Sequence, residues 1–173
     1  GGYDDGLQDI IDYVTIASTG DATDFGDLSA ARYELGANIN SSTRGLSYGG
    51  STLPAKSDVI EYITIASTGN GTDFGDLSAA KGGVGGVCSS TRGVMGGGST
   101  PSKINVIEYV TIASTGDVTD FGDFTAASNR ASVCTNTRGV YAGGGTPSLT
   151  TVIDYITIAS TGDGTDFGDL ITA

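Results

Sequence analysis

The pattern of hydrophobic and polar residues along the chain predicts short β-strands. The most hydrophobic stretches, such as residues 59–66 (VIEYITIA), carry β-branched and aromatic residues at both odd and even positions. Strands that are covered on both faces have this pattern. Further strands are predicted at residues 86–89, 93–95, 106–113 and 121–124, between segments rich in Gly, Ser, Thr and Asp. Helix-period stretches of Leu, Ala, Glu and Lys are missing, so the sequence predicts an all-β protein.

The chain consists of an internal repeat. The segment YVTIASTG, which begins at Tyr13, recurs with small changes at intervals of 49, 47 and 46 residues. Each copy is followed by the motif Thr-Asp-Phe-Gly-Asp, in which the Phe comes twelve residues after the Tyr. A second block, Thr-Arg-Gly followed by a short apolar run and Gly-Gly, precedes three of the copies. A period in the upper forties is typical of β-propellers, whose blades are four-stranded sheets.

One unit is interpreted as four short strands, and the chain as a single repeat domain, 1–173. It divides into a half blade at 1–31, which holds a third and a fourth strand, and full blades at 32–80, 81–127 and 128–173. A closed propeller needs at least four blades, whereas this chain supplies about three and a half. Because the chain begins Gly-Gly instead of Met, and an open end would leave unpaired strand edges, we expect a fragment or protomer of a larger closed ring.

The repeats resemble those of the kelch family of β-propellers. The shared features are a Gly-Gly doublet that ends the second strand, a Tyr in the third, and an aromatic residue about a dozen positions later. A basic residue before the next first strand also fits. Kelch repeats usually place Trp at the last aromatic position, whereas this chain has Phe there and no Trp. The near-identical ITIASTG…DFGDL units also resemble virion structural and tail-fibre-like proteins of marine phages, including cyanophages, which implies a virion or extracellular location.

Charge and composition exclude several functions. Twenty Asp and Glu against eight Lys and Arg give a net charge of −12, which repels a phosphate backbone, so no nucleic-acid binding is expected. Histidine is absent, which removes His-dependent triads and His metal sites. No apolar run approaches the roughly 18 residues of a membrane span, so no membrane insertion is expected.

The acidic residues indicate architecture instead of catalysis. Four copies of Asp-Phe-Gly at strand spacing, without a His-Arg-Asp loop, are not a kinase signature. A glycosidase needs two differently tuned carboxylates about 5–10 Å apart. Fifteen of the twenty acids fall at repeated positions, and the others form no convincing pair. We therefore expect no catalytic residues, with a propeller glycosidase as a distant alternative.

No cofactor is expected. Two features of the sequence could nevertheless have a chemical role, namely the Asp-rich hairpins and the two cysteines. The Asp-rich hairpins, of which residues 20–27 are the first, are interpreted as turns stabilised by Asp and Thr side chains, with calcium as the alternative. Cys88 and Cys134 occupy equivalent positions in adjacent units, where we expect small buried thiols near the ring axis and no disulfide.

One set of repeated residues is assigned to the scaffold. An Arg that recurs once per blade is suited to a bidentate bond with a carboxylate and ties blades together, with Asp24 and Asp27 as candidate partners. The structural set is Tyr13, Phe25, Arg44, Tyr62, Phe74, Arg92, Tyr109, Phe121, Arg138, Tyr155 and Phe167.

The variable loops are assigned to binding. Spacing and residue type vary in the second-to-third and fourth-to-next-first connections, which emerge on one face of an up-and-down blade. Candidate ligand-binding residues on this face are Arg32, Tyr33, Glu34, Ser51, Thr52, Lys56, Lys81, Thr100, Lys103, Asn129, Arg130, Thr146 and Ser148. The resulting hypothesis is a non-enzymatic structural or binding propeller that contacts host-surface glycans, neighbouring virion proteins or copies of itself. The alternative is an intracellular kelch-type protein-interaction adaptor.

Overall fold

The computed structural model, which describes residues 1–145 and 149–172, is all-β. The described residues form antiparallel sheets of two to four strands and no helix. They accordingly hold no helix of the length and hydropathy that crossing a membrane requires. The prediction of an all-β chain is confirmed.

Three four-stranded sheets follow one another along the chain, and within each the strands pair in sequence order. Sheet I contains β5 (Gly36–Asn40), β6 (Arg44–Tyr48), β7 (Val59–Thr64) and β8 (Thr72–Asp76). Sheet II contains β9 (Gly85–Cys88), β10 (Arg92–Gly96), β11 (Val106–Thr111) and β12 (Thr119–Asp123). Sheet III contains β13 (Ala131–Cys134), β14 (Arg138–Ala142), β15 (Val152–Thr157) and β16 (Thr165–Asp169). An N-terminal sheet pairs β3 (Ile10–Tyr13) with β4 (Thr23–Asp27), next to a hairpin of β1 (Gly2–Tyr3) and β2 (Leu7–Gln8).

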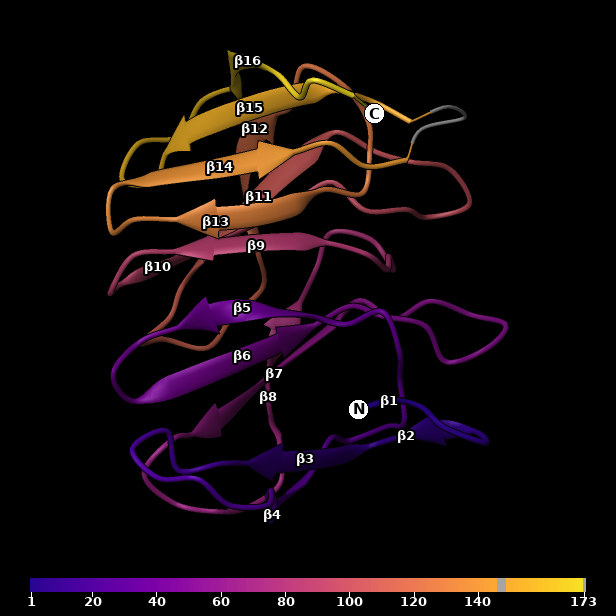
Figure 1. Ribbon diagram of the computed structural model, residues 1–173, viewed down its shortest axis with the longest axis vertical. Coiled ribbons are helices and arrows are strands. Elements are labelled where there is room, and N and C mark those ends of the chain that lie inside the picture. Colours follow the sequence, from indigo (N-terminus) through magenta and orange to yellow (C-terminus); the bar gives the residue numbers. More distant parts are fainter. Residues whose placement is uncertain (146–148, 173) are drawn as a thin grey trace.

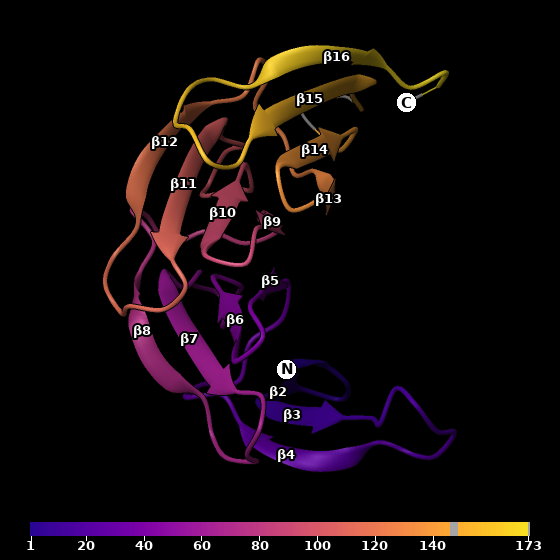
Figure 2. The ribbon, with the colours of Figure 1, turned by 90° about the vertical axis from the view of Figure 1, so that its left-hand side faces the viewer.

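The sheets are arranged side by side along an arc that is open on one side (Figures 1 and 2). Strands β4, β8, β12 and β16 follow the convex outer edge, and β5, β9 and β13 lie on the concave side (Figure 2). The hydrophobic core fills the spaces between successive sheets. Met95 on β10 belongs to the cluster shared with sheet I, whereas its neighbour Val94 belongs to the cluster shared with sheet III. Apolar residues at odd positions of β10 therefore pack against one neighbouring sheet, and those at even positions pack against the other.

The Asp-Phe-Gly-Asp motif lies within the fourth strand of each sheet, as the sequence predicted for residues 121–124. The interpretation of residues 20–27 as a turn is wrong from Thr23 onward, where β4 begins. In sheet II, β11 and β12 pair in register from Tyr109–Thr119 to Glu108–Asp120, and then shift so that Ile107 opposes Gly122. Phe121 is the extra residue of this β-bulge, which bends the strand, and its ring is buried. The same shift occurs in the other sheets. The fourth strand therefore starts at Thr119, two residues before its predicted start.

A repeated joint connects each sheet to the one before it. The hairpin between the last two strands of a sheet donates backbone amides to the outer strand of the preceding sheet. Gly116 N donates to Phe74 O at 2.6 Å, and Val118 N donates to Asp76 O at 3.0 Å. The amide of Asp76 in turn donates to the carboxylate of Asp117 at 3.0 Å. Because the hairpin must reach the neighbouring sheet as well as close its own, its length is the same in every unit.

The same joint is present on either side of this one. Gly69 N donates to Phe25 O at 2.7 Å, and Gly162 N donates to Phe121 O at 2.8 Å. At the first joint, Asn70 Oδ1 accepts from the amide of Asp27 at 3.1 Å. The exchange of Asp for Asn at this position therefore preserves the hydrogen bond, because the amide oxygen accepts as the carboxylate does.

The repeated Arg of the Thr-Arg-Gly block also connects adjacent sheets, but through a carbonyl in place of the expected carboxylate. The guanidinium of Arg44 lies 4.2 Å from the centre of the Tyr62 ring, and its Nη1 donates to Ile112 O of sheet II at 3.0 Å. Arg92 likewise stacks on its own sheet's Tyr109 and donates to Ile158 O of sheet III at 3.0 Å. No ion pair joins these arginines to Asp24 or Asp27 within the described residues.

The twelve-residue spacing from Tyr to Phe places the two rings edge to face. The ring centres are 5.9 to 6.2 Å apart in the four sheets, with interplanar angles of 78° to 83°. Aromatic rings favour this geometry because the positive edge of one meets the negative face of the other. Each of the three four-stranded sheets therefore contains a layer of Arg, Tyr and Phe.

Gly75→Ala tests the joint. A Cβ at Gly75 would overlap the backbone of Gly116 in the next hairpin, whereas a Cβ at Gly116 meets no described atom within 4 Å. Both glycines have positive φ, +145° and +152°, so backbone strain is common to both substitutions. We expect Gly75→Ala to lower the free energy of unfolding by about 1–3 kcal/mol more than Gly116→Ala, measured by urea titration. Equal losses for the two variants would contradict the joint.

Candidate loop-face binding site

The two sets of variable loops lie side by side on one face, here called the loop face. Tyr33, between β4 and β5, exchanges two backbone hydrogen bonds with Ser51, between β6 and β7, at 3.1 and 2.8 Å. Gly82 and Ser99 make the equivalent pair in the next unit, at 3.0 and 2.9 Å. The loops are therefore fastened to one another by their backbones, which leaves side chains on this face free to differ between units.

A hollow of about 620 Å³ lies on the loop face between the loops of sheets I and II. It is lined by Lys56, Ser99, Thr100, Pro101, Ser102, Lys103 and Ala127. Lys56 Nζ donates to Ser99 Oγ at 2.5 Å across the two loops. Within the described residues neither lysine lies within ion-pair distance of a carboxylate. The hollow thus offers two ammonium groups and several hydroxyls, a set that donates hydrogen bonds to polar or anionic groups.

Three cations assigned to ligand contact lie in the interior instead. Arg32, Lys81 and Arg130 are buried. Arg32 is paired with Glu61, Lys81 with Glu108 at 2.5 Å, and Arg130 with Asp154 at 3.0 Å. Burial lowers the pKa of the Arg32 and Arg130 guanidinium groups, and the facing carboxylates oppose that shift. These side chains are therefore unavailable to a ligand on the loop face.

The buried carboxylates also connect adjacent sheets. Glu61 on β7 accepts from the amide of Ser29, which follows the outer strand of the preceding sheet, at 2.7 Å. Glu108 accepts from Ser78 N at 3.1 Å in the same way. In the third unit the shorter Asp154 accepts from both the amide and the hydroxyl of Thr125. Each carboxylate has charged and polar partners, which offset the cost of burying it.

The sequence contains a signal for these ion pairs in the joint recurrence of cations and acids. In every full unit a cation lies within the first three residues, and an acid directly precedes the repeated Tyr 24 to 29 residues later. Cation and acid recur together, as expected of partners. Variable neighbours such as Tyr33 and Gly82 conceal this signal, because they favour an assignment of the cations to the loops.

The remaining loop candidates differ in exposure. Glu34 is exposed, while Tyr33, Thr52, Lys56, Thr100, Lys103 and Asn129 are half-buried. Ser51 is buried by its pairing with the neighbouring loop. Tyr33 and Glu34 belong to a second, larger hollow of about 750 Å³ beside β3, away from Lys103. Thr146 and Ser148 lie outside the described residues.

The two cysteines lie at the hairpin ends of adjacent inner strands. Cys134 is exposed and Cys88 is half-buried, so the expected burial is wrong for Cys134. Cys88 N donates to Cys134 Sγ at 3.4 Å, and both thiols are free. Burial raises the pKa of the Cys88 thiol, which disfavours the reactive thiolate.

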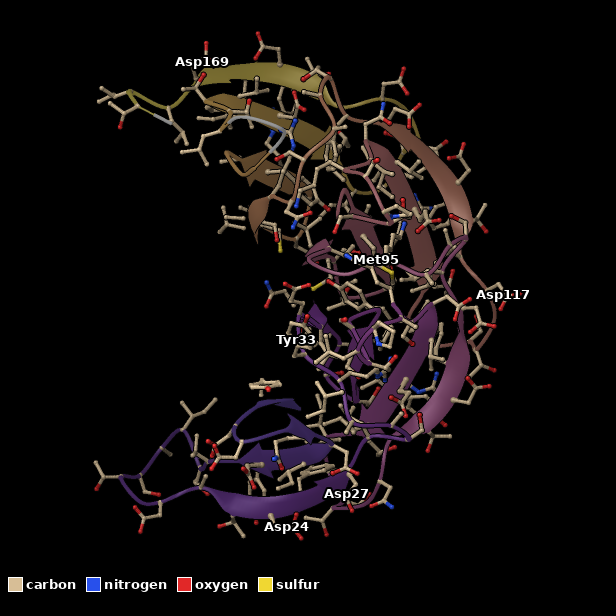
Figure 3. All side chains as sticks on the ribbon, turned by 90° about the vertical axis from the view of Figure 1, so that its right-hand side faces the viewer. Asp24, Asp27, Tyr33, Met95, Asp117 and Asp169 are labelled. Carbon is tan, nitrogen blue, oxygen red and sulfur yellow. The ribbon has the colours of Figure 1, made fainter. Side chains whose placement is uncertain are left out.

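The repeated aspartates are distributed along the outer edge of the arc, where Figure 3 shows Asp24, Asp27, Asp117 and Asp169. Desolvation and the neighbouring Asp58 and Asp117 raise the pKa of Asp76 on this edge. Among the described residues no three His, Cys, Asp or Glu side chains are grouped so that they could hold a metal ion. Asp117 and Asp163 accept backbone amides across the joints.

Comparison with known proteins adds no relative. No protein-family model matches the chain, and a search of curated proteins found no match.

Lys81→Met tests whether the buried cations are structural. The substitution would leave Glu108 buried without its charge partner, and we expect the free energy of unfolding to fall by about 3–5 kcal/mol. Lys81→Arg should lose far less, because Arg32 occupies the equivalent position opposite Glu61. Thermal and urea unfolding followed by circular dichroism measure both variants, with Lys81→Met/Glu108→Gln expected to recover part of the loss. Unchanged stability of Lys81→Met would contradict the ion pair.

Proposed function

We propose that the chain is a non-enzymatic scaffold of the β-propeller type that binds polar carbohydrates on its loop face. Propeller blades are four-stranded antiparallel sheets set around a common axis, with inner and outer strands. Support comes from the three sheets of sequential antiparallel strands on an arc, with β5, β9 and β13 toward the concave side (Figure 2). We further propose a virion-associated role in contact with a host surface, which is what the resemblance of the repeats to tail-fibre-like phage proteins implies.

The single observation that carries the binding proposal is the hollow with Lys56 and Lys103. Of the eight cations in this chain of net charge −12, three are used in buried ion pairs. Arg44 and Arg92 are used between sheets. Within the described residues Lys56 and Lys103 have no carboxylate partner and share one hollow with Ser99 and Thr100, which is an exception to the architectural use of charge. Their chemistry favours a carbohydrate that carries carboxylate or sulfate groups.

The opposite side of the molecule is unsuited to variation. Its hairpins contact the preceding sheet through backbone hydrogen bonds, so a change in their length or conformation would alter the joint. On the loop face backbone hydrogen bonds at Ser51, Ser99 and Gly83 also join neighbouring loops, but the length and sequence of these loops differ from unit to unit. A scaffold that is repeated on one side, with loops that vary on the other, is a common arrangement in binding proteins.

An array of neutral and acidic glycans tests the proposal, followed by calorimetry with the acidic glycan that binds best. We expect Lys56→Ala/Lys103→Ala to weaken binding at least tenfold, because each amine contributes a charge-assisted hydrogen bond. The matched control is Ser67→Asp/Ser114→Asp, which changes the net charge equally at exposed residues of the hairpins. Binding by the control should remain at the wild-type level. Failure to bind any glycan, or equal weakening in the control, would contradict the proposal.

A further inference from the structure

The N-terminal end of the arc carries one half of the joint that connects the sheets. Residues 17–21 (ASTGD) have the sequence of the internal hairpins. Ser18 N donates to Thr15 O at 3.1 Å, as Ser114 N does to Thr111 O in the next but one unit, so the turn is already formed. Gly20 and Asp21 are exposed, and neither has a hydrogen-bond partner among the described residues. The hairpin at 14–22 therefore has the groups that form a joint, but no strand among the described residues lies against them.

The C-terminal end carries the other half. Phe167 on β16 is 56% exposed, whereas the equivalent Phe74 and Phe121 are 2% and 3% exposed beneath the next hairpin. A Cβ at Gly168 would meet no described atom within 4 Å, whereas one at Gly122 would overlap the following hairpin at Gly162. On the outer edge of β16, Phe167 and Gly168 are thus uncovered, whereas a following hairpin covers the equivalent residues of β8 and β12.

The Arg contact between sheets is also divided between the two ends. Arg138 stacks on Tyr155 at 4.5 Å, as Arg44 and Arg92 do on their tyrosines, but has no carbonyl acceptor among the described residues. The acceptors in the internal contacts are the carbonyls of Ile112 and Ile158, whose side chains are 1% and 0% exposed. The equivalent residue at the other end is Ile16, which is 99% exposed.

We infer that two copies of this chain associate head to tail, with the 14–22 hairpin of each copy on β16 of the other. Gly20 N then donates to Phe167 O, the carboxylate of Asp21 accepts from the amide of Asp169, and Arg138 donates to Ile16 O. The two ends of the arc flank its open side, so two such joints close one ring of two chains (Figure 2). Figure 3 shows Asp169 at one end of the arc and Asp24 and Asp27 at the other.

A second copy is the occupant that the structure favours because both halves of the interface are present in one chain. The joint occurs three times internally with the same donors, acceptors and glycine, so the geometry of the new contact is already established. Exposed strand edges and exposed hydrophobic side chains such as Phe167 and Ile16 are covered at the same time. Because the two contacts close a ring, no free end is left to which a further copy could bind, and the number of copies is fixed.

This inference extends the propeller arrangement of the proposed function but uses no residue of the loop-face hollow. Its test measures mass, so it can fail while carbohydrate binding stands, and the reverse. In sedimentation equilibrium of the full chain we expect a single species of twice 17.3 kDa. A monomer up to the highest soluble concentration would overturn the inference and assign the two ends to other partners. A series of open oligomers would overturn ring closure.

Variants of one aspartate locate the contact. Asp21→Ala removes an acceptor at both joints of the ring, and we expect the dissociation constant of the pair to rise about tenfold or more. Asp21→Asn should leave it unchanged, because Asn70 makes the equivalent bond within the chain. Asp24→Ala, an exposed neighbour with the same loss of charge, is the control and should also leave it unchanged. A dimer whose dissociation constant is unaffected by Asp21→Ala and by Gly168→Ala would overturn the assigned contact.

Discussion

The structure depends on a backbone hydrogen bond from the amide of a hairpin glycine to the carbonyl of a phenylalanine on the preceding sheet's outer strand. Strands of four to six residues in a single small sheet bury too little to be stable alone. The joint holds the next sheet at a fixed position, so that the apolar faces meet and the clusters around Met95 and Val94 become cores. The bulge at Phe121 and the bare glycine at Gly122 both serve this contact: the first buries the ring, and the second admits the next hairpin.

Most of the polar chemistry of the chain is used for the same purpose. Carboxylates before each repeated tyrosine are buried with a cation and also accept an amide from the preceding sheet. Arginines of the Thr-Arg-Gly block stack on a tyrosine and donate to a carbonyl of the following sheet. Charges that are used in this way cannot serve a ligand. Among the described residues Lys56 and Lys103 are not used in this way, so the functional proposal rests on them, and the proposed association of two copies rests on the groups at the ends of the arc.

The sequence was sufficient to predict the all-β fold, because glycine doublets, β-branched runs and the exact repetition of the Tyr-to-Phe spacing are local signals. It also placed the variable loops on one face, where Tyr33 and Ser51 now pair. It did not place the side chains of Arg32, Lys81 and Arg130, because a residue in a variable loop can still direct its side chain inward. Nor did it find the bulge at Phe121 or the hydrogen bonds between sheets, since these depend on how close two distant segments approach. The hollow at Lys56 and Lys103 required the same information, because its two lysines belong to different sheets.

Hydrogen exchange of individual glycine amides, followed by nuclear magnetic resonance, tests the joint most directly. Gly69, Gly116 and Gly162 lie in exposed hairpins, where a glycine amide without a partner exchanges rapidly with solvent. If these amides are bound to the preceding sheet, all three should exchange as slowly as the strand amides of β7, β11 and β15. Exchange at the rate of an unprotected loop at all three positions would contradict the joint, and with it the arrangement of the sheets.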